Sequence, residues 1–230
     1  MIPRGRRVVC AAALIINWVG MAGTSFAMGN AGTTSSSSVA LGTSCHSSDP
    51  GHLCIALKYV SFSDASGRSV TSAKQALRNL ATINSTWNQC SLNFEIDQFT
   101  VVDPADDHLS FHTANYGDLT DIRNAFQDPR MLLIVTTGAW DRSGSLGDSQ
   151  ANAWTSMPGD GPYGAIFEAS VAGYPAIFAH ELGHYLDLDH VRDNGNVMNA
   201  IIYPGSTRLL PSQCQIARAS AKQAWAKMLR

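Results

Sequence analysis

The stretch HELGHYLDLDH occupies residues 180–190 and places three histidines and a glutamate close together. His180 and His184 are four residues apart, so on a helix they lie on one face, one turn from each other. Both imidazoles can then bind one ion, at about 2.0–2.1 Å from nitrogen to zinc. Glu181 lies beside the pair, where it can act as general base toward a metal-activated water. The stretch therefore predicts a metal site on a helix.

His190 is the natural third ligand, because a catalytic zinc takes three protein ligands and keeps one position open. On a straight helix it would lie about 9 Å further along the axis than His184. We therefore expect the helix to end between them and the chain to fold back. Asp187 stands where glycine would turn easily; aspartate also adopts the left-handed conformation, at a cost of about 1 kcal/mol. The alternative that Asp189 or Asp193 supplies the third ligand stays open.

Outward from this stretch, the chain alternates strand and helix patterns. The segment 53–62 alternates apolar and polar residues like a half-buried strand, whereas 131–137 is continuously apolar and should be buried on both faces. Pro158 ends the segment 151–158, which should be an edge strand. Further strands are predicted at residues 92–102 and 163–171, and helices at residues 70–87, 118–126, 175–187 and 211–229. This order predicts an α/β (α+β) domain.

The first 27 residues have the pattern of a secretory signal peptide. Three arginines precede an apolar run at residues 8–19, and Ser25 and Ala27 are the small residues of a cleavage site after Ala27. We therefore expect a secreted or periplasmic protein.

The next segment, residues 28–50, is rich in Ser, Thr and Gly and predicts a flexible leader. Residues 51–230 are long enough for a single folded catalytic domain. Removal of the signal peptide takes three of the 16 basic residues and leaves 13 against 18 acidic ones, a net charge of −5. Such a chain has no electrostatic footprint for nucleic acid or an anionic membrane. We expect a monomer that binds neither nucleic acid nor, after signal cleavage, a membrane.

Four cysteines remain after cleavage: Cys45, Cys54, Cys90 and Cys214. An even number in an exported chain indicates two disulfides, with three ways of pairing them. We favour Cys45–Cys54 with Cys90–Cys214. The first bond would fasten the leader to the first strand, and the second would tie an early helix to the last one.

HELGHYLDLDH, followed by Asn196-Val197-Met198-Asn199, resembles the metzincin clan of zinc metallopeptidases, whose pattern is HExxHxxGxxH with a later Met-turn. In particular it resembles small secreted bacterial members. The resemblance places His180, His184 and His190 on the zinc ligands, Glu181 on the general base and Met198 on the methionine beneath the metal. Asp187 at the glycine position is the departure from the pattern. The match is strong over residues 176–199, suggestive over 130–175 and only topological before that.

The resemblance implies a twisted, mostly parallel sheet with an antiparallel edge strand, an active-site helix, a Met-turn and a C-terminal helix. It implies a secreted zinc endopeptidase that acts on proteins or peptides, with one Zn²⁺. Substrate would pair with the edge strand and meet a wall formed by residues 199–206. The candidate substrate-binding residues are Ala151, Asn152, Ala153, Trp154, Ile201 and Tyr203. A zinc-bound but inactive binding module is the alternative that Asp187 keeps open.

Other polar residues carry weaker signals. Asp141, Asp148 and Asp160 lie in glycine-containing loops, where an oxygen-ligated calcium ion could bind. His108 and His112 share the four-residue spacing of the motif, but no glutamate follows either, so we expect them on a solvated surface.

Overall fold

The computed structural model describes residues 11–12, 38–41, 45 and 49–230. Most of the predicted signal peptide, with its cleavage site after Ala27, lies outside the described residues, as does most of the predicted leader. In the described part of the chain, no helix has the length and apolar character needed to cross a membrane.

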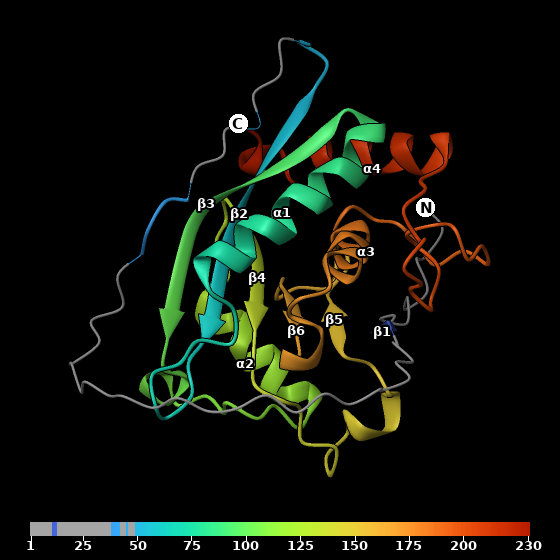
Figure 1. The fold of residues 1–230 in the computed structure, drawn as a ribbon. Coiled ribbons are helices and arrows are strands. Elements are labelled where there is room, and N and C mark those ends of the chain that lie inside the picture. The colour runs from blue at the N-terminus through green and yellow to red at the C-terminus, as the bar shows by residue number, and fades with distance from the viewer. Residues whose placement is uncertain (1–10, 13–37, 42–44, 46–48) are drawn as a thin grey trace.

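The strands form one sheet, in the order β1-β5-β6-β4-β2-β3 (Figure 1). The parallel strands are β2 (Leu53–Phe62), β3 (Leu92–Val102), β4 (Leu132–Thr136) and β6 (Ala165–Phe167). Strand β5 (Ala153–Thr155) pairs antiparallel with β6, and the two-residue β1 (Ala11–Ala12) pairs antiparallel with the outer side of β5. The predicted α/β sheet, mostly parallel with an antiparallel edge, is confirmed.

Helices cover both faces of this sheet. The helices are α1 (Ala73–Trp87), α2 (Tyr116–Phe126), α3 (Pro175–Tyr185) and α4 (Pro211–Gln223), with short 3-10 helices η1 (Asn88–Cys90), η2 (Pro104–Asp107), η3 (Gly147–Ser149), η4 (Ala169–Val171) and η5 (Ala226–Met228). Apolar residues of α1, α3 and α4 form one core with the sheet, and those of α2 form a second core on the other face. Helix α3, which carries the motif, lies beside α1 on one face of the sheet and packs against β5 and β6 (Figure 1).

Strand β2 has the predicted bounds, but the expectation that it is half-buried was wrong. Eight of its ten residues are buried, because it lies between β3 and β4 with helices over both faces. Its polar residues find partners inside. Ser61 is fully buried, where its hydroxyl accepts from the N–H of Thr71 and contacts the hydroxyl of Thr136. Alternation along the sequence therefore did not mark a solvent face.

Strand β3 also has the predicted bounds and α2 begins two residues earlier than predicted, but several other elements are shorter. The expected strand 151–158 is reduced to β5, because the chain turns away after it and the N–H of Asp160 donates to the carbonyl of Met157. The expected strand 163–171 is reduced to β6, and the C-terminal helix ends at Gln223.

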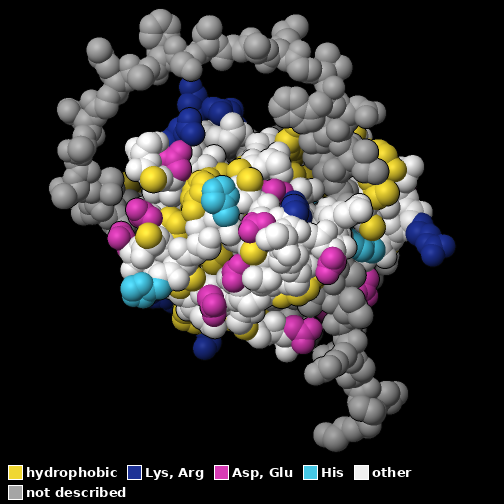
Figure 2. All heavy atoms as spheres, turned by 90° about the horizontal axis from the view of Figure 1, so that it is seen from below, with side chains coloured by type: hydrophobic (Ala, Val, Ile, Leu, Met, Phe, Trp, Pro, Cys, Tyr) yellow, Lys and Arg dark blue, Asp and Glu magenta, His cyan; other side chains and the backbone are white. Residues whose placement is uncertain are grey.

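Both favoured disulfides are present. Cys45–Cys54 joins the leader to β2, and Cys90–Cys214 joins η1 to α4, with Cα–Cα distances of 5.6 and 4.9 Å. Figure 2 shows the face that lies lowest in Figure 1, where acidic side chains are scattered between apolar patches.

Candidate metal centre

Helix α3 is buried over residues 177–185, and this packing fixes the direction of its polar side chains. Pro175 is its first residue, as predicted, and suits that position because a first-turn N–H has no helical partner. Gly183 lies against Met198: a Cβ at this glycine would come within 2.2 Å of the methionine sulfur. Met198 is fully buried in the turn at residues 196–199, so this turn packs directly beneath the helix.

The chain folds back after helix α3, as predicted. Asp187 has a φ of 66°, in the left-handed region. Its N–H donates to the carbonyl of His184, and the N–H of Leu188 donates to the carbonyl of Gly183, both at 3.0 Å. These two bonds make a Schellman motif, with aspartate where glycine is usual. The turn brings His190 to the face of the helix that carries the other two histidines.

The three imidazole rings converge on one point. Nε2 of His184 lies 3.1 Å from Nε2 of His180 and 3.2 Å from Nε2 of His190, and the remaining pair is separated by 3.1 Å. His180 and His184 are buried, whereas His190 is half-buried. The group is therefore reached from solvent on the side of His190.

Hydrogen bonds to backbone carbonyls determine which ring nitrogen of His180 and His184 carries the proton and which keeps its lone pair. Nδ1 of His180 bonds to the carbonyl of Val197 at 2.7 Å, and Nδ1 of His184 bonds to the carbonyl of Leu188 at 2.8 Å. A carbonyl only accepts, so Nδ1 carries the proton and Nε2 is left with its lone pair.

Burial keeps all three rings neutral. Burial lowers the pKa of His180 well below its ordinary value and lowers that of His184 to about 4. Burial also lowers the pKa of His190, against the charge of Asp189, which raises it. Neutral imidazole is the form that binds a metal.

These residues fit a zinc ion. The Nε2 lone pairs of His180 and His184 face each other at 3.1 Å and repel, and a cation between the rings removes the repulsion. Nitrogen ligands of a tetrahedral zinc lie about 3.3–3.4 Å apart, which the rings reach by moving apart by about 0.2 Å. Asp189 and Asp193 do not belong to the group, and Asp193 pairs with Arg208 instead. The structure therefore favours His190 as the third ligand.

Glu181 follows His180 in helix α3 and is fully buried, and its two carboxylate oxygens have different surroundings. Oε2 accepts a hydrogen bond from the hydroxyl of Thr155 on β5, at 2.6 Å, while Oε1 has no partner among the described residues. Burial raises the pKa of Glu181 to about 8, and the Thr155 bond and the charge of Arg123 act against it. A dication held by the histidines would also act to lower the pKa of Glu181.

Thr155 and Arg123 were missed by the sequence analysis. Arg123, from α2, is buried and donates to the carbonyls of Gly164 and Trp154 at 2.9 and 2.8 Å. The face of the strand on which Thr155 lies could have been predicted from the sequence. Thr155 lies two residues after Ala153 on the same strand, so both side chains point to the same face. Nothing local in the sequence indicated that this face meets Glu181.

The predicted substrate-binding residues lie in two different places. Ala153 and Trp154 are in β5, whereas Ala151 and Asn152 precede it. Ala151 is fully buried and its carbonyl accepts from Arg142, while the Asn152 amide donates to the carboxylate of Glu168. These two residues thus hold the loop before the strand.

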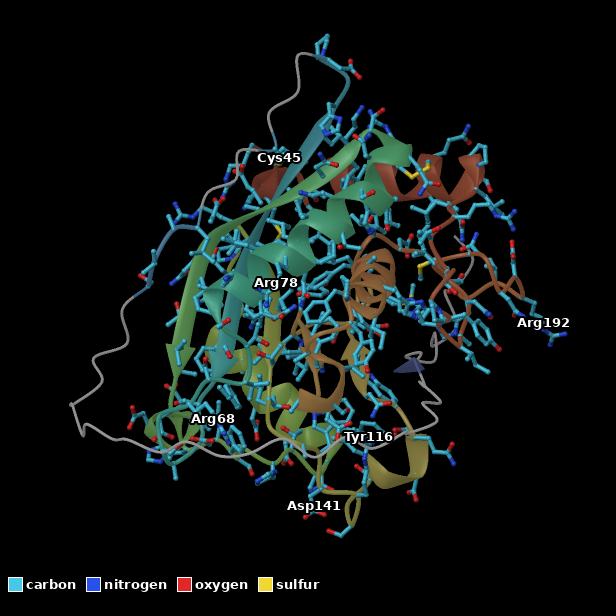
Figure 3. All side chains as sticks on the ribbon, in the orientation of Figure 1. Cys45, Arg68, Arg78, Tyr116, Asp141 and Arg192 are labelled. Carbon is cyan, nitrogen blue, oxygen red and sulfur yellow. A yellow bond between two sulfur atoms is a disulfide. The ribbon has the colours of Figure 1, made fainter. Side chains whose placement is uncertain are left out.

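The remaining predicted substrate contacts have large exposed side chains. Ile201 and Tyr203, in the segment after the Met198 turn, are 37% and 40% exposed. Tyr116, labelled in Figure 3, packs its ring against Trp154, with centroids 4.8 Å apart. Contact of Trp154, Ile201 and Tyr203 with substrate stays a prediction; Tyr116 was not among the predicted residues.

The structure gives no support to the predicted calcium site. Among the described residues, the acidic residues Asp141, Asp148 and Asp160 belong to no group that could hold an ion, and Asp141 lies exposed in its loop (Figure 3). One further group, Cys45, Cys54 and Glu95, contains two cysteines that are already joined in a disulfide. Histidines His108 and His112 are exposed, as expected, and belong to no such group.

The fold and this centre together define a metalloproteinase-like α/β protein with a three-histidine group that could hold a metal ion. The chain is similar to the crystal structure of metalloproteinase-II from Bacteroides fragilis, with a TM-score of 0.50 and 17% sequence identity. The match covers 72% of this chain and 53% of the other, so the chain spans about half the length of that protein. At this identity the likeness shows the fold alone. No protein-family model matches the sequence, and neither does any curated protein.

Proposed function

We propose that this chain is an exported zinc endopeptidase of the metzincin type, which hydrolyses peptide bonds in protein or peptide substrates. The observation that carries the proposal is the convergence of three Nε2 atoms beside a buried glutamate. An uncompensated buried charge is costly, so a carboxylate is not expected to be buried next to a histidine cluster that has no function.

The roles of the residues follow from their positions. His180, His184 and His190 would hold the ion, and Met198 would support them from beneath. Zinc bound there would supply Lewis-acid chemistry, lowering the pKa of a water and polarising the scissile carbonyl. Glu181 would take the proton of the attacking water and return it to the leaving amine.

Strand β5 would bind the substrate by strand addition. Its outer side already pairs antiparallel with β1, opposite Trp154 and Ala153, so its backbone groups can accept an extended segment. Ile201 and Tyr203 would contact the residues beyond the cut bond. The two disulfides and the apolar N-terminal run support export, and we propose a monomer without nucleic-acid or membrane partners.

The substitution Glu181→Gln tests the proposal. It should retain one zinc per chain while the rate of cleavage of casein or a quenched peptide falls by about a hundredfold or more. His108→Asn, which changes an exposed histidine outside the centre, is the matched control and should leave both quantities unchanged. A zinc-loaded wild type that cleaves no substrate would favour the inactive binding module instead.

A further inference from the structure

The two oxygens of the Glu181 carboxylate have different surroundings. Both lie in a fully buried side chain, yet Oε2 is bonded to the Thr155 hydroxyl at 2.6 Å and Oε1 is a buried acceptor without a partner among the described residues. Buried polar atoms in folded proteins almost always have a partner, so an unpartnered one beside a candidate metal centre points to a water or substrate group.

Thr155 is itself held firmly in place. It is fully buried in β5, opposite Ala165 of the neighbouring strand. The carbonyl of the preceding residue, Trp154, accepts from the guanidinium of Arg123 on the far side of the sheet. A β-branched side chain also has few χ1 rotamers, so the hydroxyl is a fixed donor. Glutamate, by contrast, has three rotatable side-chain bonds and needs an external contact to fix its carboxylate.

We propose that Thr155 is a positioning residue for Glu181. Its hydroxyl holds Oε2 and so leaves Oε1 as the oxygen that accepts the proton of the attacking water and later delivers it to the leaving amine. The proposal rests on the proposed function. It also places the strand that would bind substrate in direct contact with the general base, because Thr155 belongs to both.

Two substitutions separate this role from a merely structural one. Thr155→Val keeps the shape and removes the donor, whereas Thr155→Ser keeps the donor. In the zinc-loaded protein, Thr155→Val should lower kcat about ten- to a hundredfold, as expected for the loss of a hydrogen bond to a charged group, and change KM less than threefold. Thr155→Ser should stay within about threefold of the wild type. Thr155→Val should add nothing to the loss caused by Glu181→Gln, because both act through the same carboxylate.

Crystal structures of the same zinc-loaded proteins supply a second readout that needs no turnover. The Glu181 carboxylate should have one orientation in the wild type and in Thr155→Ser, and a rotated or split one in Thr155→Val. An unmoved carboxylate in Thr155→Val, or equal losses of kcat in the Val and Ser variants, would overturn the proposal. If the wild type cleaves nothing, the proposed function fails, and the carboxylate orientation still decides whether Thr155 positions Glu181.

Discussion

The turn at residues 186–190 and the loop at residues 138–152 lead to the same centre but are held in different ways. In the turn, backbone N–H groups donate to carbonyls three and five residues earlier, and the carbonyl of Leu188 then orients His184. The loop adds the contacts of one long side chain to its backbone bonds with residues 111, 113 and 114. Arg142 donates to the carbonyls of Leu146 and Ala151 and forms an ion pair with Glu168, which lies after β6.

The difference teaches what each segment depends on. The turn is held by its own backbone hydrogen bonds. It should tolerate any substitution at position 187 whose residue can adopt a left-handed conformation. In the loop, one guanidinium gathers two carbonyls and a carboxylate, oxygens of the kind that bind calcium. We infer that Arg142 is a partly exposed cation that helps to order this loop. The contrast yields three predictions, and the first concerns His190, which the turn brings to the centre.

His190→Ala should have the largest effect. It removes the ligand that the turn delivers, so the affinity for zinc should fall by more than about a thousandfold, because two ligands cannot complete the centre. Competition with a chromophoric chelator measures the affinity, and the control is His108→Asn. Undiminished zinc content in His190→Ala would mean that the third ligand comes from elsewhere, and the fold-back of the chain would then need another explanation.

Glu168→Gln tests the loop. The change keeps the shape but leaves the guanidinium of Arg142 without its carboxylate, which also accepts from the N–H of Trp140. Side-chain exposure is 36% for Arg142 and 8% for Glu168, so solvent screens part of the charge. We expect unfolding to become easier by about 1–3 kcal/mol in urea titrations.

Amide hydrogen exchange localises this effect. Exchange should become faster at residues 138–152 and stay unchanged at residues 186–190, because the turn is held by its own backbone hydrogen bonds. Arg68→Met, which breaks the highly exposed pair with Asp64, is the control and should leave the urea midpoint unchanged. Equal acceleration in both segments would show that they form one cooperative unit and that the contrast between them is wrong.

The same contrast explains how much the sequence could predict. The bounds of β2 and β3, the start of α3 and the left-handed turn at Asp187 all follow from local spacing and propensity, and the structure has them. Thr155 and Glu168 could not be assigned, because their partners lie 26 residues away along the chain. Strand alternation also failed for β2, since it cannot tell a water-facing residue from one such as Ser61, whose partners lie on other elements.

Asp187 offers the smallest and most specific test, because two substitutions there differ by a single methyl group. Asp187→Gly and Asp187→Ala both remove the carboxylate and every contact it makes, so those losses cancel when the variants are compared. At a φ of 66°, alanine carries the steric cost of the left-handed region and glycine does not. Greater freedom of glycine in the unfolded chain offsets part of that cost. Asp187→Gly should therefore be more stable than Asp187→Ala by about 1 kcal/mol in urea unfolding of the zinc-loaded protein, with equal zinc content. Equal stability would mean that the left-handed turn is not what holds His190 in place.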